Sequence, residues 1–385
     1  MDEIGGPPRR KGLLDHFATI TDTRQPCKVM YPLGEVLALV VCATISACDD
    51  YDDIVLWGNA HLSFRRRLAP YHWGVPCADW LRVVMNRVDP DLFSACFRAF
   101  VADMLPGSVD QIAIDGKTSR RSHDRGRGQA ALHLVSAYAT THNLVLGQIP
   151  VPDKTNEIGA IPVLLRQLGE KGRLKGALVT IDAIGCTPGV TEAIVEAGAD
   201  YLIATKDNQP TVHAEIERYF ADAPAREIDT MSSVGKAHGR IETRRCRLST
   251  VVDWMSGHRR YPGEPRFKGL AAIAVIDTTS ESNGHTAVER RCFVSSAKLD
   301  ARRFATAVRN HWRIENGLHW VLDVTFKEDQ SRLRKGHGAK NMAIVRHFAL
   351  NLVRTAQGPK SIKGRRKLAG WDTAYLQSIL TAQAR

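Results

Sequence analysis

Residues 111–117 read QIAIDGK, an apolar run that ends in Asp115 and continues into glycine and lysine. Residues 178–185 read LVTIDAIG and repeat the pattern, with Asp182 after a second strand-like run. An acid at the carboxyl end of a buried strand lies where α/β sheets place functional groups. Two such strand ends in one sheet can direct Asp115 and Asp182 towards one spot. Taken singly, each aspartate is also explained as a turn residue that ends its strand.

The sequence around these acids predicts an α/β fold with a mixed sheet. Three successive strands followed by alternating helices and strands are typical of that layout. The predicted strands are 111–115, 131–140, 144–151, 177–182 and 201–205, and the predicted helices among them are 157–168 and 187–197.

The flanking regions differ from this alternating segment. Residues 1–106 predict helices only, including 79–87 and 90–104 around a tight turn; this pair is either a DNA-reading helix-turn-helix or part of a small helical bundle. Residues 221–298 predict a β-rich insertion with strands 238–252, 269–278 and 286–296, followed by long helices over 300–322 and 339–355. We therefore expect an N-terminal helical domain that binds DNA (1–106), a core (107–220 and 299–355), the insertion (221–298) and a basic tail (356–385).

A third acid, Glu315, lies within the predicted helix over 300–322. At about 100° per residue it falls in the middle of an apolar stripe. The stripe consists of Phe304, Val308, His311, Trp312, Leu318, His319 and Leu322. A carboxylate on the core-facing side of a helix costs several kcal/mol unless it is compensated. A divalent metal shared with the two aspartates would compensate it, and a buried pair with an arginine or lysine is the alternative.

Three carboxylates from two strand ends and a helix would form an oxygen-rich site. Hard cations such as Mg²⁺ or Mn²⁺ prefer these ligands. Two such ions can activate a water or hydroxyl and stabilise the leaving oxygen in a phosphoryl displacement. The sequence therefore predicts Asp115, Asp182 and Glu315 as catalytic and metal-binding residues for two Mg²⁺ or Mn²⁺ ions.

The composition favours a polyanionic substrate. The 385 residues contain 53 Lys+Arg and 41 Asp+Glu, a formal net charge of +12. A basic folded protein is suited to nucleic acid, although charge alone is weak evidence. The longest uncharged apolar run is too short for a membrane span, and the start MDEIGG does not resemble a secretory signal. The eight cysteines are scattered without a Cys-x-x-Cys motif. We expect a cytoplasmic protein with reduced thiols and no membrane partner.

Several ordered motifs resemble those of DDE transposases of bacterial insertion sequences, in the group that includes the H-repeat-associated proteins. They are IDGK (114–117), DKTNEI (153–158), IDAIGC (181–186), KDNQ (206–209), HWRIENGLHW (311–320) and SIKGRRK (361–367). The resemblance implies a ribonuclease-H-like core interrupted by the β insertion, and it implies the same triad of acids. Many relatives carry Tyr, Arg and Lys around the glutamate, where this sequence has Val308, His311 and Leu322. Any DNA-hairpin step that depends on those neighbours is therefore in doubt.

Basic and amide residues near the acids and in the tail are candidates for DNA contacts. Ordinary solvated side chains are the alternative for most of them. The candidates are Lys117, Lys154, Asn156, Lys206, Asn208, Gln209, His311, Arg313, Asn316, His319, Arg332, Arg334, Lys335, Lys363, Arg365, Arg366 and Lys367.

The sequence therefore favours a transposase that binds the inverted-repeat ends of its own element and catalyses strand cleavage and strand transfer. Double-stranded DNA, as element ends and target, would be its partner. Because both ends must be cut together, we expect a homodimer or a larger synaptic complex. A non-catalytic DNA-binding derivative and a ribonuclease-H-like nuclease without strand transfer are the alternatives.

Overall fold

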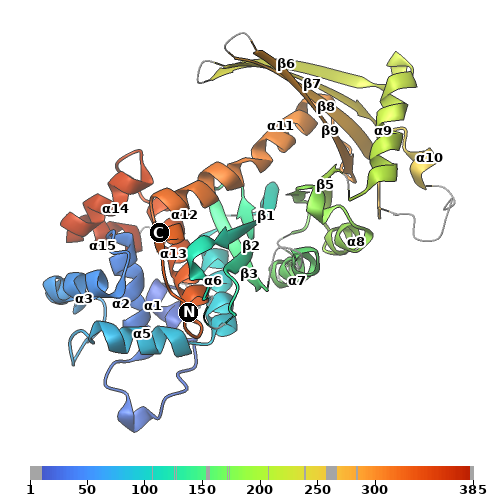
Figure 1. Cartoon of the computed structure of the whole chain (residues 1–385). Helices are drawn as coiled ribbons and strands as arrows, with labels where there is room; N and C mark the ends of the chain where they lie inside the picture. The colour runs from blue at the N-terminus through green and yellow to red at the C-terminus, as the bar shows by residue number, and fades with distance from the viewer. Residues whose placement is uncertain are drawn as a thin grey trace, which may run out of the picture.

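A mixed sheet of nine strands runs through the protein in the order β3-β2-β1-β4-β5-β9-β8-β7-β6 (Figure 1). The strands are β1 Gln111–Ser119, β2 Leu132–Ala139, β3 Leu144–Val151, β4 Leu178–Ile181, β5 Asp200–Thr205, β6 Asp229–Ala237, β7 Arg240–Ser249, β8 Ala272–Ser282 and β9 His285–Ser295. This computed structural model describes residues 11–105, 107–124, 126, 128–152, 157–170, 172, 174–206, 208–237, 240–256, 267–282 and 285–381.

The first five strands form a ribonuclease-H-like core, as the sequence predicts. β1, β2 and β3 are antiparallel neighbours, whereas β1, β4 and β5 run parallel. Parallel neighbours need crossover connections, and α7 (Glu157–Gly169) and α8 (Pro188–Glu196) supply them. The parallel strands therefore present their carboxyl ends at one edge of the sheet.

The insertion extends this same sheet instead of forming a separate one. β9 pairs with β5 in antiparallel fashion, and β8, β7 and β6 follow outward (Figure 1). Sequence inspection missed β6, which has little apolar alternation, and α9 (Pro210–Asp222), which begins at a proline. α9 packs against β8 and β9, and α11 (Ala301–His311) packs against β6 and β7.

The N-terminal helices share a core with the C-terminal helix α13 (Gly338–Thr355). The ring of Phe348 in α13 lies 5.4 Å from that of Phe17, 4.9 Å from that of Phe97 and 5.0 Å from that of Phe100. The helices of this lobe are α1 Leu13–Phe17, α2 Leu33–Ile45, α3 Tyr51–Ala60, α4 Leu62–Arg65, α5 Ala78–Arg87 and α6 Pro90–Met104. The aromatic cluster ties this lobe to the ribonuclease-H-like core.

The predicted basic tail is folded. Its residues form α14 (Ile362–Trp371) and α15 (Thr373–Thr381), which pack against α13, and α14 also packs against α2. In the described part of the chain, no helix combines the length and apolar character needed to cross a membrane.

The predicted long helix over 300–322 is interrupted. α11 ends at His311, a π-helical turn follows over Glu315–His319, and α12 spans Trp320–Val324. In the π turn the Trp320 amide donates to the carbonyl of Glu315, five residues earlier. Gly317 lies in this turn, where an added Cβ would be 2.5 Å from the Tyr138 hydroxyl. The helix therefore passes β2 so closely that only glycine fits there.

Candidate active site

The pairing of β1 with β4 places the two predicted aspartates side by side. Ile114 pairs with Ile181 in parallel register, so Asp115 of β1 lies beside Asp182, the first residue after β4. The prediction that the first strand ends at Asp115 is wrong, because β1 continues to Ser119. The Asp115 carboxylate accepts a hydrogen bond from the Gly116 amide at 2.8 Å. Asp182 accepts one from the Ile184 amide at 3.2 Å, within the short 3-10 turn that follows β4. Both carboxyl groups therefore lie at the carboxyl edge of the sheet.

The π turn brings Glu315 and His319 to the same place. Potential ligand atoms of Asp115, Glu315 and His319 all lie within 4.8 Å of one another. The Nδ1 atom of His319 is 3.5 Å from the Asp115 carboxylate and 3.4 Å from that of Glu315. Asp182 is outside this group, although its charge acts on Asp115. Of the three predicted acids, the structure brings Asp115 and Glu315 into direct contact and leaves Asp182 as their neighbour.

The pKa values of Asp115 and Glu315 are shifted in opposite directions. Burial, followed by the charge of Glu315, raises the pKa of Asp115 to about 8. A hydrogen bond from His319 is the main cause that holds the pKa of Glu315 below its ordinary value. Because Asp115 is the more buried of the two, we place the shared proton on Asp115, which then donates to the ionised Glu315. A divalent cation between these oxygens would replace that proton, so the donor set fits Mg²⁺ or Mn²⁺.

The prediction that Glu315 faces the core is wrong. Its side chain is 47% exposed, whereas Ile314 and Leu318 are fully buried. The prediction assumed one uninterrupted α-helix, and the π turn changes the phase of the side chains. The partner of Glu315 is His319 rather than an arginine or lysine.

Asn208 and Gln209 hold the loop that carries Asp182. The Asn208 side-chain amide donates to the Ala183 carbonyl at 2.6 Å, and that of Gln209 donates to the Cys186 carbonyl at 2.9 Å. These contacts fix the loop, which is a different role from the DNA contact predicted for both residues. Lys206, immediately before them, is exposed.

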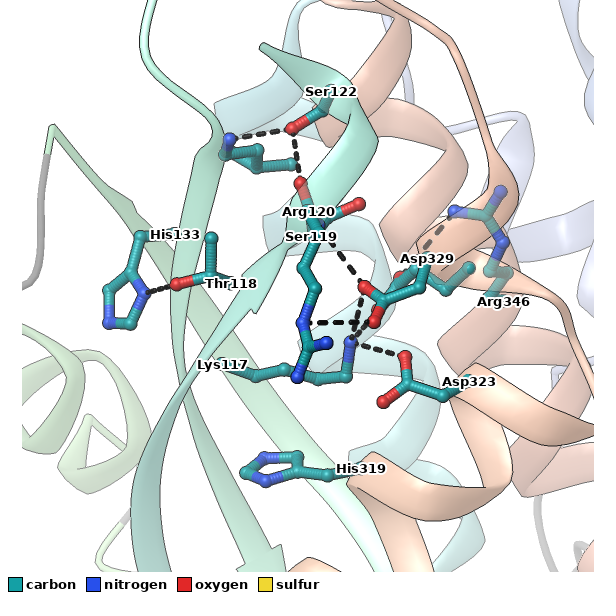
Figure 2. A network of polar contacts seen from close by, with 12 residues as sticks. Lys117, Thr118, Ser119, Arg120, Ser122, His133, His319, Asp323, Asp329 and Arg346 are labelled. Carbon is teal, nitrogen blue, oxygen red and sulfur yellow. Dashed lines mark hydrogen bonds and ion pairs between the residues drawn. The ribbon is translucent and has the colours of Figure 1, made fainter.

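Lys117 is buried in an ion-pair network rather than available to phosphate, which corrects its predicted role. Its Nζ atom lies 2.7 Å from Asp323 and 3.0 Å from Glu328 (Figure 2). Arg346 reaches the other oxygen of Glu328 at 3.4 Å. Burial alone would raise the pKa of Glu328, but Lys117 and Arg346 hold it below its ordinary value. The network joins β1 to the segment that follows α12.

A second set of polar contacts, from Thr118 through His133 to Glu157, lies close to Asp115 on β1. The Thr118 hydroxyl contacts Nδ1 of His133 at 2.7 Å, and Nε2 of His133 contacts Glu157 at 2.6 Å. A Cβ added to Gly116 would be 2.5 Å from the Glu157 carboxylate. Glu157 is therefore a buried partner of His133 that packs against Gly116.

The polar residues beside Glu315 have structural contacts. Burial lowers the pKa of His311 to about 4, and its Nδ1 atom lies 3.1 Å from the Thr180 hydroxyl. A neutral imidazole does not offer a phosphate the positive charge of an arginine, which argues against the predicted DNA contact of His311. Arg313 donates to the Thr140 carbonyl at 2.9 Å, and Asn316 donates to the Trp312 carbonyl at 3.4 Å.

Two arginines of the predicted DNA-binding tail are structural. Arg366 is 2% exposed and donates to the Thr44 carbonyl at 2.9 Å and to Asp49 at 2.8 Å. Arg365 donates to the Val353 carbonyl at 3.0 Å and to the Pro359 carbonyl at 2.7 Å. The remaining candidates are Arg332, Lys335, Lys363 and Lys367, which are exposed, Arg334, which is partly buried, and Lys154 and Asn156, which lie outside the described residues.

Sequence inspection missed a groove between the insertion and α11. Its volume is about 350 Å³, and it reaches Trp312, three residues before Glu315. Its charged lining consists of Arg240, Glu242, Arg244, Glu289, Arg291 and Arg309. The lining contains four arginines and two glutamates, so the net charge of the groove is positive. The sequence signal for this groove is the alternation of charged residues along β7 (Arg240, Glu242 and Arg244), but β6, which also lines it, was not predicted.

Comparison with known proteins agrees with this arrangement. Residues 106–352 match the family model described as Transposase DDE domain, and residues 14–101 match one described as DDE_Tnp_1-associated. The chain belongs to the DDE transposase family.

Similar proteins include the “H repeat-associated putative transposase YhhI” of Escherichia coli (strain K12). It is 36% identical over 381 residues, which cover 96% of this chain and 98% of that one. The “Putative transposase YncI” of Escherichia coli O157:H7 is 35% identical over 381 residues, covering 97% and 95% respectively. A weaker likeness, with a TM-score of 0.41 and 12% identity, links 97% of this chain to 77% of a chain in the piggyBac transposase synaptic complex with hairpin DNA.

Proposed function

We propose that this protein is a transposase that binds the inverted-repeat ends of an insertion sequence, cuts the DNA there and joins the freed 3′ ends to target DNA. The observation that carries the proposal is the contact between Asp115 on β1 and Glu315 in the π turn, beside Asp182 on the neighbouring strand. The insertion lies between Asp182 and Glu315 in the sequence, yet Glu315 comes close to Asp115 in the folded chain. Their convergence supports a site for phosphodiester chemistry.

In this proposal Asp115, Asp182 and Glu315 hold two Mg²⁺ or Mn²⁺ ions. Such a pair activates the attacking water or hydroxyl and stabilises the leaving oxygen. The protein orients the ligands: the Gly116 amide fixes Asp115, and Asn208 and Gln209 fix the loop of Asp182. Each of these contacts restrains a loop or carboxylate before substrate arrives, which lowers the cost of ordering the site.

The partner in this proposal is double-stranded DNA, both as element end and as target. The net charge of +12 and the arginine-lined groove beside Glu315 support it. Exposed Lys206, Arg332 and Lys335 add positive charge. The N-terminal helices over 14–101 would bind the element ends. Because two ends must be cut together, the working form would be a homodimer or larger synaptic complex associated with the bacterial nucleoid in the cytoplasm.

The test uses duplex DNA that carries the sequences flanking the coding region of this protein. We expect Mg²⁺-dependent nicking and joined product, both abolished by EDTA. Glu315→Gln and Asp115→Asn should lose cleavage and keep DNA binding, whereas Glu192→Gln, which changes an exposed acid on α8, should keep both activities. Binding without cleavage by the unaltered protein would instead identify a non-catalytic DNA-binding derivative. Cut ends without joined product would identify a nuclease.

A further inference from the structure

His319 is a buried imidazole that points at two acids. Its side chain is 8% exposed, and its Nδ1 atom contacts the carboxylates of Asp115 and Glu315 at 3.5 and 3.4 Å. Among the described residues, its Nε2 atom has no hydrogen-bond partner. The position of this ring is therefore set, as far as polar contacts go, by the acid pair.

Two other histidines beside the site, His133 and His311, have different polar contacts. His133 has partners for both nitrogens, Thr118 and Glu157, and so serves the packing of β1 against α7. His311 contacts the Thr180 hydroxyl on β4. The polar contacts of His319 instead concern the carboxylates that would hold a metal ion. Contacts that stabilise the fold account for the positions of His133 and His311. They do not account for the orientation of His319 towards two carboxylates.

The distances from His319 Nδ1 to the two carboxylates are close to those between ligands on a single cation. Ligands with bonds of about 2.1 Å lie roughly 3.0–3.4 Å apart around one ion. The Nδ1–oxygen distances are within a few tenths of an ångström of that range. Only small side-chain movements are therefore needed to place the imidazole nitrogen and one oxygen of each acid on the same ion.

We propose that Nδ1 of His319 is a metal ligand together with Asp115 and Glu315, and that this nitrogen makes the site prefer Mn²⁺ to Mg²⁺. The inference rests on the proposed function for the metal-binding role of the two acids. Mg²⁺ takes oxygen ligands almost exclusively, whereas imidazole favours transition-metal ions. An all-oxygen triad would have no such preference built into it.

The test is electron paramagnetic resonance of Mn²⁺ bound to the full-length protein. A second group, His213, Glu217 and Cys292, also offers donor atoms within 4.8 Å among the described residues. All samples should therefore carry His213→Asn. We expect a ¹⁴N hyperfine coupling that becomes a ¹⁵N coupling when histidine is isotopically labelled, without any further substitution. This nitrogen coupling should vanish in His319→Gln. It should persist in His311→Gln, which changes the histidine at the end of α11.

Binding measurements provide the second readout. His319→Gln should weaken Mn²⁺ binding about tenfold or more and change Mg²⁺ binding much less. Bound Mn²⁺ that requires Asp115 but shows no histidine nitrogen coupling would overturn the inference and leave His319 as a positioning residue. That outcome leaves the proposed function intact, because cleavage would still depend on Asp115 and Glu315. If Asp115→Asn affects neither metal binding nor cleavage, the proposed function itself fails.

Discussion

Carboxylate oxygens of Asp115 and Glu315 lie within 4.8 Å of each other, and this approach brings β1 next to the helical segment that follows the insertion. Two acids in contact inside a protein repel each other when both are ionised. The repulsion between the two carboxylates is therefore relieved by a proton below about pH 8, and a divalent cation would relieve it by taking the place of that proton.

The first prediction concerns Asp115→Asn in EDTA. Folding raises the pKa of Asp115 to about 8, so the stabilisation from its proton is complete below the unfolded value of about 4 and is lost as the pH rises through 8. Near pH 9 the variant should be more stable than the unaltered protein, by roughly 1–4 kcal/mol. Near pH 4 the difference should be small. Urea unfolding at both pH values measures it, and an equal difference at both would contradict the shared proton.

Local sequence patterns predicted the regular elements well. β3 (Leu144–Val151) and α6 (Pro90–Met104) have the predicted bounds. In α6 the signal is local, because Asp89 accepts hydrogen bonds from the amides of Asp91 and Leu92 and Pro90 occupies the first turn. The neighbouring positions of Asp115 and Asp182 were also predicted from the two strand patterns, although β1 continues past Asp115 to Ser119.

The failures depend on contacts between distant residues. The exposure of Glu315 follows from the π turn, at which Arg354 donates to the Gly317 carbonyl. The burial of Arg366 requires Asp49 and the Thr44 carbonyl, which lie far away in the sequence. A periodic pattern or a cluster of basic residues contains no information about such distant partners. The interrupted helical segment around Glu315 was therefore predicted as one continuous helix. Arg366, which has structural contacts, was predicted to contact DNA.

The second prediction separates two neighbours on α14. Arg366→Ala should destabilise the protein by about 3–5 kcal/mol, because it removes a buried guanidinium that binds the Thr44 carbonyl and Asp49 and leaves Asp49 with Lys327 alone. Lys367→Ala, at an exposed position on the same helix, should change stability by less than about 0.5 kcal/mol. Thermal or urea unfolding measures both. Equal, small effects would show that the buried contacts of Arg366 contribute nothing.

The third prediction concerns the ion-pair network of Lys117, Asp323, Glu328 and Arg346. Lys117→Met removes the cation that lies 3.0 Å from the buried Glu328 and should cost about 3–5 kcal/mol. Since the pKa of Glu328 is lowered in the folded state, the network's contribution is present above the unfolded value and is lost on acidification. The difference between variant and unaltered protein should therefore shrink as the pH falls below about 4. Lys335→Met, at an exposed position, is the matched control.

The fourth prediction concerns the glycine after Asp115. In Gly116→Ala the new Cβ would be 2.5 Å from Glu157 and 2.7 Å from His133, so β1 or α7 must shift. Metal-dependent cleavage should fall by about 100-fold, because a displacement near 1 Å is enough to misplace a reacting group. Gly189→Ala, where no atom lies within 4 Å of the new Cβ, should keep full activity. Unchanged cleavage by Gly116→Ala would show that the polar contacts of His133 and Glu157 do not position Asp115.

The last prediction concerns the groove between the insertion and α11. If DNA lies in this groove, each arginine that neutralises a phosphate releases counterions, and the slope of log K against log salt falls by about 0.9 when it is removed. Arg309 lines the groove, whereas Arg303 is exposed on the same helix outside the lining. Arg309→Ala should therefore weaken binding of duplex DNA and reduce the slope by about one. Arg303→Ala should leave the slope unchanged, and equal slopes for the two variants would place the DNA elsewhere. Because the groove reaches Trp312, three residues before Glu315, a reduced slope for Arg309 alone would support a DNA path that runs along the groove towards the acids.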